Sequence, residues 1–273
     1  MKKIIAFTLA LTLCLGLTGC GLVEKLLGVG GAEDLSYEHS EYDNPGSFCY
    51  SVLGKLSVDA GPVKVPMKLE VNGRSTREPN RSCADISVGA MTIQVENKIY
   101  SEELDGVLYT YIGTKDEDEI DWETDSTKMG DTDITMEDLP EFLQKLTEME
   151  KTGTAKAATG DRGDFYEGYI NADRIDEALD FLLSMEPGKK SQEAREEIDE
   201  MLQGMDPDLK LPTTVIIEGD RVLEIYLDLM PIADQFLEET EDREAEITEF
   251  CLRVNFWNYD SAEPITIPAE ARN

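Results

Sequence analysis

Apolar and polar residues alternate with a period of two along most of the chain after residue 46, and this pattern predicts β-strands. The clearest example follows the turn residues Asp59-Ala60-Gly61-Pro62, where polar residues separate Val63, Val65, Met67, Leu69 and Val71. Such alternation is typical of a strand that buries one face. Residues 47–71 are therefore predicted to form a β-hairpin, and Pro66 predicts an edge position or a bulge within it.

Further strands are predicted along the rest of the chain. One runs over residues 83–96. Its apolar side chains, which are expected to face the core, change from even-numbered to odd-numbered positions around Gly89, and this change predicts a β-bulge there. The same alternation predicts strands over residues 99–102, 107–113, 120–124, 165–170, 211–218, 222–229 and 247–258. A tight turn is expected at Gly219-Asp220.

A helical period of apolar residues replaces the alternation in the middle of the chain. Amphipathic helices are predicted over residues 139–149, 175–183 and 194–202, with a short one over 232–237. Strands flank this helical segment without regular alternation of strand and helix. The pattern predicts the α+β class, with one antiparallel sheet covered on one side by helices in a single domain of residues 47–273.

The first twenty residues have the form of a bacterial lipoprotein signal. Lys2 and Lys3 precede a short apolar stretch, and the stretch ends at Leu17-Thr18-Gly19-Cys20, which matches a lipobox. We therefore expect residues 1–19 to be removed as a signal peptide and Cys20 to carry a diacylglyceryl anchor. Two acyl chains hold a protein stably on a bilayer. The expected location is the extracytoplasmic face of a cell membrane.

Residues 20–46 are predicted to form a flexible tether between the anchor and the folded domain. They contain Gly28, Gly30 and Gly31, then polar and acidic residues, and end at Asn44-Pro45-Gly46. A flexible chain of this length spans about 28 Å on average.

The chain is strongly acidic, with 25 Lys and Arg residues against 58 Asp and Glu residues and a formal net charge of −33. Such a chain is repelled by nucleic acid, so no nucleic-acid partner is expected. The acidity can serve solubility alone, or it can capture cations in the envelope.

The sequence lacks the residues that most catalytic and metal-binding sites require. The single histidine, His39, lies in the predicted tether, which disfavours a zinc site, a Ser-His-Asp triad or a Cys-His pair. Loops beginning at Asp116 or Asp131 lack the glycine that a calcium-binding EF-hand requires at its sixth position. We predict no enzymatic activity, no cofactor and no metal. A hydrolase with a pair of carboxylates is the remaining enzymatic alternative.

Three cysteines remain in the predicted domain: Cys49, Cys83 and Cys251. The alternation places each of them on the polar face of its strand. An exported protein can form disulfides. The sequence therefore allows one disulfide between an unknown pair and one free thiol, or three unpaired thiols.

Four segments of the predicted domain form a familiar set: the run Asn97-Lys98-Ile99-Tyr100, the stretch from Asp105 to Tyr111, Trp122, and the closing run from Ile265 to Ala271. In these segments the chain resembles uncharacterised bacterial lipoproteins with the LolA/LppX-like fold. The resemblance implies a curved antiparallel sheet, an unclosed half-barrel, whose concave side is covered by helices. It also implies a lipid-sized apolar cavity between the sheet and the helices.

The leading functional hypothesis is a non-enzymatic lipoprotein that binds or transfers a hydrophobic ligand such as a lipid. The candidate cavity-lining residues are Leu143, Leu146, Leu179, Leu183, Leu223, Ile225 and Leu227. The same residues can fill a solid core, as inward apolar residues usually do. In that case we expect an interaction or sensing module that binds another envelope protein through its acidic surface.

Overall fold

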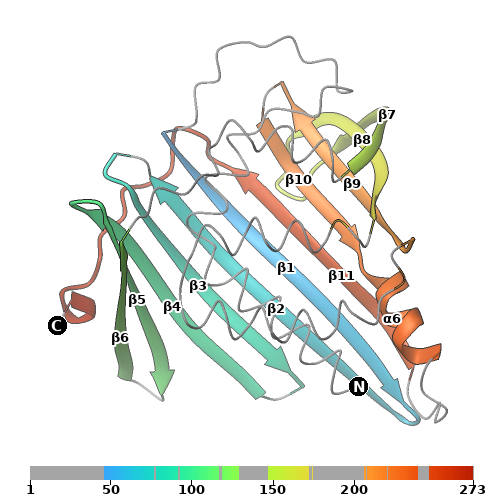
Figure 1. Cartoon of the computed structure of the whole chain (residues 1–273), viewed down its shortest axis with the longest axis horizontal. Coiled ribbons are helices and arrows are strands. Elements are labelled where there is room, and N and C mark those ends of the chain that lie inside the picture. The colour runs from blue at the N-terminus through green and yellow to red at the C-terminus, as the bar shows by residue number, and fades with distance from the viewer. Residues whose placement is uncertain are drawn as a thin grey trace.

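One large antiparallel sheet dominates the computed structural model, which describes residues 46–76, 78–91, 93–116, 119–128, 147–171, 174, 206, 208–219, 221–238 and 246–272 (Figure 1). The strands are β1 (Ser47–Ala60), β2 (Val63–Thr76), β3 (Arg81–Ala90), β4 (Ile93–Leu104), β5 (Val107–Asp116), β6 (Glu119–Lys128), β7 (Thr147–Lys156), β8 (Arg162–Asn171), β9 (Lys210–Glu218), β10 (Arg221–Asp228) and β11 (Glu246–Trp257).

The strand order is β6-β5-β4-β3-β2-β1-β11-β10-β9-β8-β7, so the sheet consists of two antiparallel meanders. They meet where β1, the first strand, pairs with β11, the last. Strands β6 and β7 form the two edges and do not pair with each other. The sheet is therefore unclosed.

The two faces of the sheet differ in character, and the strand register defines them. The inner face carries Tyr50, Val52 and Phe256, which are buried together with neighbours from β2, β3 and β4 in one apolar cluster. The outer face carries the intervening residues, such as Ser51 and Asn255, which lie opposite each other on β1 and β11. Because side chains alternate between faces, the buried face is apolar and the other is largely polar.

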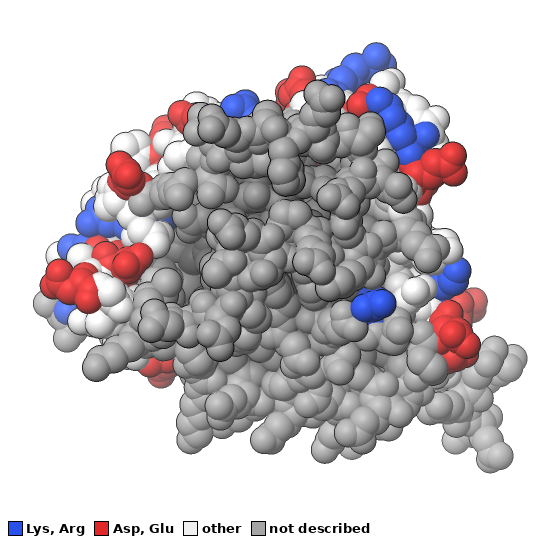
Figure 2. All heavy atoms as spheres, turned by 45° about the horizontal axis from the view of Figure 1, so that its top comes forward, with Lys and Arg blue, Asp and Glu red and all other residues white. Residues whose placement is uncertain are grey.

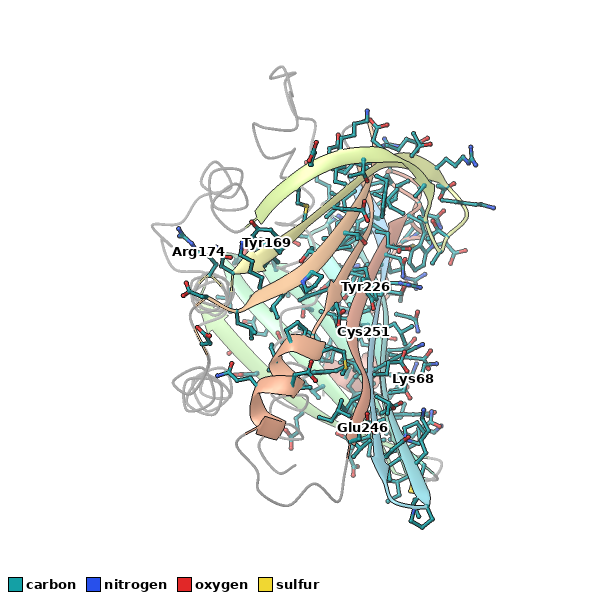
Figure 3. The ribbon with its side chains drawn as sticks, turned by 90° about the vertical axis from the view of Figure 1, so that its right-hand side faces the viewer. Lys68, Tyr169, Arg174, Tyr226, Glu246 and Cys251 are labelled. Carbon is teal, nitrogen blue, oxygen red and sulfur yellow. The ribbon has the colours of Figure 1, made fainter. Side chains whose placement is uncertain are left out.

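The prediction of a helix-covered α+β fold is wrong. Among the described residues the secondary structure is almost entirely strand, with α6 (Met230–Glu238) and the 3-10 helix η2 (Ala269–Arg272) as the exceptions. Helix α6 confirms the short predicted helix; its Ile232 and Ala233 pack with Leu56 and Phe250 at one end of the inner face. Figure 3 shows α6 on one side of the sheet and Lys68 projecting from the other.

Two local strand predictions also differ from the structure. The expected single strand over 83–96 is in fact the end of β3 and the start of β4, joined by a hairpin turn at Met91 with a φ of 54°. The shift of apolar positions near Gly89 therefore arises from a chain reversal. Strand β7 was missed because a helical period was expected to continue to residue 149. The other predicted helices, and all of 139–146, lie outside the described residues.

The chain after β11 crosses the outer face of the half of the sheet formed by β1 to β6. We call residues 259–272 the C-terminal strap. Its backbone begins with a hydrogen bond from Asp260 N to Ser47 O at 2.7 Å. Its end packs Ile267 and Ala271 against Tyr111 on β5. Figure 1 shows the C-terminus beside the β4–β6 side of the sheet.

A buried acid fastens the end of the strap. The carboxylate of Glu102, which is 1% exposed, accepts hydrogen bonds from Arg272 Nε at 2.9 Å and Nη2 at 2.7 Å. Arg81 Nη2 lies 3.2 Å away, and the Tyr111 hydroxyl donates a hydrogen bond at 3.1 Å. A buried charge is tolerated when it is paired and hydrogen-bonded in this way.

Candidate functional site

An apolar strip on the inner face is the first candidate site. It comprises the inner-face side chains at one end of three neighbouring strands together with the turn between two of them: Val63, Val65, Met67, Val88, Ala90, Met91, Ile93 and Val95. Burial falls steadily toward this end of the sheet. On β4 the exposed fraction rises from 3% at Ile99 to 48% at Val95 and 71% at Ile93.

The local strand lengths create this exposure. Strand β3 ends at Ala90, opposite Met67, while the β1–β2 hairpin continues to Gly61. Pro66 therefore lies beyond the ladder with β3, and its carbonyl accepts a hydrogen bond from Met91 N at 3.4 Å. A proline is compatible with this position because it lacks the N–H that an interior ladder would use. The outcome is an apolar surface that continues from the buried core to solvent.

The residues predicted to line a cavity are separated by the structure. Ile225 packs against the central inner-face cluster, and Leu227 packs against the cluster that contains α6. Leu223 lies elsewhere: a register irregularity between Val222 and Glu224 places it in the outer-face cluster with Ala157. An extra residue in one strand re-aims a side chain in this way. Leu143, Leu146, Leu179 and Leu183 lie outside the described residues, as does Cys20.

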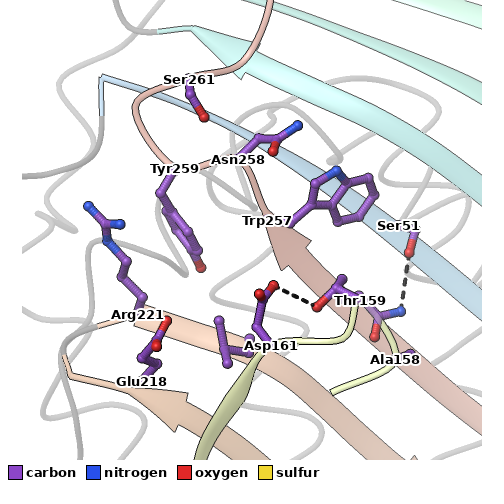
Figure 4. A pocket seen from close by; sticks show the side chains of 12 residues that line it. Ser51, Ala158, Thr159, Asp161, Glu218, Arg221, Trp257, Asn258, Tyr259 and Ser261 are labelled. Carbon is purple, nitrogen blue, oxygen red and sulfur yellow. Dashed lines mark hydrogen bonds between the residues drawn. The ribbon is translucent and has the colours of Figure 1, made fainter. Parts of the chain in front are cut away.

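A polar cleft on the outer face is the second candidate site, with a volume of about 680 Å³. It lies at the opposite end of β1 from the apolar strip, and it is lined by Ser51, Ala158, Thr159, Asp161, Glu218, Arg221, Leu223, Asn255, Trp257, Asn258, Tyr259 and Ser261 (Figure 4). Of these residues only Leu223 was among the predicted cavity-lining residues, and it was expected in an apolar cavity. The one available signal was the run of aromatic and polar residues that ends β11, from Trp257 to Ser261.

The turn between β7 and β8 forms one wall of the cleft. Its backbone is closed by a hydrogen bond from Ala157 N to Asp161 O at 2.8 Å. Ala158 N donates to the Glu224 carboxylate on β10 at 2.8 Å, which fixes the turn against the sheet. The Thr159 hydroxyl donates to Asp161 Oδ2 at 3.1 Å. This wall is thus held by contacts within the turn and by one to β10, which lies two strands away from β8 in the sheet.

The segment that follows β11 forms the opposite wall. Asn258 and Asp260 have φ values of 55° and 59°, a left-handed conformation that Asn and Asp tolerate better than most residues. Tyr259 lies between them and donates its hydroxyl proton to Val222 O. Arg221 lies over the Tyr259 ring, 5.2 Å from its centroid, and pairs with Asp260 at 3.1 Å.

The floor of the cleft contains an unsatisfied polar atom. Asn255 is only 7% exposed, and its Nδ2 donates to Ser51 Oγ at 3.2 Å. Its Oδ1 is buried without a hydrogen-bond partner. A buried acceptor without a donor is destabilising by about 1–3 kcal/mol, so such atoms require an explanation.

Cross-strand ion pairs occupy the rest of the outer face. Lys98 pairs with Asp85, which lies directly across a strand pair, and Lys115 pairs with Glu96 on the neighbouring strand, each at 2.6 Å. Figure 2 shows described acidic and basic side chains interspersed along the rim of the molecule. Opposite charges at facing positions stabilise the sheet and leave little local net charge.

All three cysteines of the domain are free thiols on the outer face, which is where the alternation predicted them. Cys83 accepts a hydrogen bond from Arg74 Nε at 3.3 Å. Burial raises the pKa of the Cys83 thiol, partly offset by Arg74, and burial likewise raises the pKa of Cys251. A raised pKa lowers the fraction of reactive thiolate at neutral pH. Within the described ranges, no group of three or more His, Cys, Asp or Glu residues is arranged to hold a metal ion.

Comparisons with known proteins give little further information. No family model matches the chain. No curated protein matches it either. One solved structure with similarity is a DUF1329 family protein from Desulfovibrio piger, at 10% sequence identity and a TM-score of 0.22, covering 81% of this chain and 89% of that one. At this TM-score the resemblance to LolA/LppX-like lipoproteins stays a prediction.

Membrane association is likewise a matter of prediction. Among the helices that the structure describes, none is long and apolar enough to cross a membrane.

Proposed function

We propose that this chain is an extracytoplasmic lipoprotein that binds a hydrophobic ligand, such as the acyl chain of a lipid, on the apolar strip. A diacylglyceryl group on Cys20 anchors it to the membrane, and residues 20–46 tether the folded domain. The protein acts by binding or transferring the ligand, without catalysis.

The exposure gradient across β2, β3 and β4 carries this proposal. Ile93, Met91, Val95 and Val63 are 71%, 64%, 48% and 45% exposed, and all lie at one end of the inner face. Soluble proteins rarely leave neighbouring large apolar side chains in water without a binding role. An acyl chain on this surface gains about 0.8 kcal/mol for each methylene that it buries.

The strip also lacks charged side chains. Its inner-face positions on β2, β3 and β4 are all apolar up to Asn97. An apolar chain can therefore lie along it without desolvating an ion, which would be costly. The alternative function, a module that binds another envelope protein through acidic surface, lacks a comparable local feature because the described outer-face charges are largely paired.

Native mass spectrometry tests the proposal directly. The chain from residue 20 onward, with Cys20→Ser to prevent lipidation, is purified from bacteria without detergent and then extracted with organic solvent. We expect a co-purified lipid at a stoichiometric amount. A ligand-free mass that persists after incubation with phospholipid vesicles would contradict lipid binding, and the search then moves to protein partners.

Two variants locate the binding surface. Ile93→Asp places a charge in the strip at a highly exposed position, so it should weaken binding of a fluorescent fatty acid at least about tenfold with little effect on folding. Leu104→Asp is the control, because Leu104 is also an exposed apolar residue (48%, against 71% for Ile93) and lies on the same strand outside the strip. Equal losses in the two variants would show that the strip is not the binding surface.

The anchor has its own test. Metabolic labelling with an alkyne analogue of palmitate should label the wild-type protein, and Cys20→Ala should abolish the label and block signal-peptide removal. A wild-type protein that is exported but unlabelled would refute the anchor without bearing on ligand binding.

A further inference from the structure

We propose that the polar cleft on the outer face is a second binding site, and that its ligand is an uncharged saccharide. This site is independent of the apolar strip, from which it is separated by the sheet itself. Its volume of about 680 Å³ lies within the roughly 300–1,000 Å³ of sites for small organic ligands.

The cleft combines aromatic rings with hydrogen-bonding groups. Trp257 on β11 and Tyr259 just after it contribute the aromatic side chains, while Ser51, Asn255 and Asn258 contribute neutral polar ones. Figure 4 shows Trp257 and Tyr259 on two sides of the same space. A sugar ring has an apolar face of C–H groups and an edge of hydroxyls. Aromatic side chains with polar neighbours match this amphipathic surface.

The unsatisfied oxygen of Asn255 indicates the ligand chemistry more narrowly. Oδ1 is a buried acceptor without a donor, in a residue that is 93% buried because its exposed fraction is 7%. A ligand hydroxyl at the floor of the cleft supplies the missing donor once the side chains that cover Oδ1 shift slightly. A site built around such an acceptor discriminates strongly in favour of ligands that carry the matching hydroxyl.

Charge argues against an anionic ligand. Arg221, a cation of the cleft lining, is already paired with Asp260, while the lining also contains the two acids Asp161 and Glu218. The rim therefore carries more negative than positive charge, on a chain whose formal charge is −33. Phosphorylated or acidic sugars are repelled under these conditions. Carboxylates also accept hydrogen bonds from sugar hydroxyls.

The walls are arranged before a ligand arrives. Ala158 N is bonded to Glu224 on one side, and Tyr259 is bonded to Val222 on the other. Both walls are thereby attached to β10, and the floor belongs to β1 and β11. Pre-ordered walls reduce the entropy lost on binding, which matters for a weakly hydrophobic ligand.

Calorimetric titration of the chain from residue 20 onward, with Cys20→Ser, tests the proposal with chitotriose, cellotriose and maltotriose as probes. We expect at least one of them to bind with a Kd of about 1 mM or tighter. Glucose 6-phosphate serves as the anionic comparison and should bind at least tenfold more weakly. Absence of binding by all three neutral sugars at concentrations of about 10 mM would overturn the proposal.

Variants then locate the site. Trp257→Ala and Asn255→Leu should each weaken the affinity at least tenfold. Asn97→Leu is the matched control: Asn97 also has a buried unpartnered side-chain oxygen, but it lies on the inner face. A loss of affinity in Asn97→Leu equal to that in Asn255→Leu would contradict the assignment to the cleft.

Tryptophan fluorescence provides a second readout, with conservative replacements of each tryptophan by phenylalanine. The chain has two tryptophans, Trp122 and Trp257. In a Trp122→Phe background, the bound sugar should shift the emission of Trp257, and in a Trp257→Phe background the same sugar should leave the emission unchanged. The reverse pattern would place the sugar at the C-terminal strap and refute the proposal.

Discussion

The two faces of this sheet share the same strands but are stabilised by different interactions. On the inner face, fully buried side chains such as Tyr50, Phe256 and Val71 pack in continuous apolar clusters. On the outer face, ion pairs, a fastened C-terminal strap and a polar cleft occupy the equivalent positions. The candidate sites follow this division: the apolar strip opens where burial ends on one face, and the cleft forms where polar loops fold over the other.

This comparison shows that the strand register determines which side chains lie on each face of the sheet. A one-residue change moves a side chain to the opposite face. Leu223 is the example within the structure, because the irregularity next to it transfers a leucine to the polar side, where it lines the cleft. The two sites also lie at opposite ends of β1, a strand of 14 residues, which spans about 45 Å.

The largest effect is expected from the buried acid on the outer face. Glu102→Gln removes the charge that pairs with Arg81 and Arg272. We expect the free energy of unfolding to fall by about 3 kcal/mol, because the buried side chain loses its charge-assisted hydrogen bonds with Arg272 and its ion pair with Arg81. Urea denaturation measures this change.

The matched control is Glu249→Gln, which breaks the exposed pair with Lys55, where both side chains are more than two-fifths exposed. Such pairs contribute less than about 1 kcal/mol. If the two variants lost the same stability, the outer face would not depend on a buried polar network as described.

A pair of glycine substitutions compares the faces directly. Gly73 lies opposite Tyr50 on the inner face, and an added Cβ would meet the Tyr50 ring at 2.3 Å. Gly113 lies opposite Trp122 on the outer face, where the closest approach is 2.7 Å, to Ile120. We expect Gly73→Ala to lower the free energy of unfolding by about 2 kcal/mol, because the fully buried ring has no room to move.

Gly113→Ala should cost less, on the order of 1 kcal/mol, since Trp122 is only partly buried and can shift outward. Thermal unfolding of the two variants and the wild type gives the comparison. A larger loss for Gly113→Ala would mean that the outer face is packed at least as tightly as the inner face.

A smaller effect is expected at alkaline pH. Burial, followed by contact with Cys251, raises the pKa of Tyr226 from 10.0 to about 12. Because the folded protein holds the neutral phenol more tightly than the unfolded chain does, the stability contribution is fully present below pH 10 and is lost as the pH rises toward 12. Tyr226→Phe should flatten the decline of the melting temperature in this range. An unchanged decline would show that Tyr226 is not the group responsible.

Much of the sheet was predictable from the sequence because alternation survives wherever one face is buried. The hairpin around Gly61, the strands that became β5, β8, β9 and β10, and the polar orientation of Cys49, Cys83 and Cys251 all follow from that period. Strand pairing did not follow, because the contact between β1 and β11 joins residues about 200 positions apart, such as Cys49 and Trp257.

The errors have identifiable physical causes. A tight turn at Met91 carries none of the usual glycine or proline signals at its centre, so two strands were taken for one. Residues 147–156 include a glycine and alternate weakly, which obscured β7. The cleft could not be predicted from the sequence because its residues come from four separate segments of the chain. Polar residues also show no periodic pattern that would indicate a shared site.

Photo-crosslinking with a diazirine-bearing fatty acid tests the central claim most directly, namely that the apolar strip is the surface that receives a hydrophobic ligand. After irradiation and proteolysis, mass spectrometry identifies the labelled peptides. The account predicts label on peptides that contain residues 63–67 and 88–95, and competition by unlabelled fatty acid. Label concentrated at the outer-face cleft, around residues 158–161 and 257–261, would contradict it.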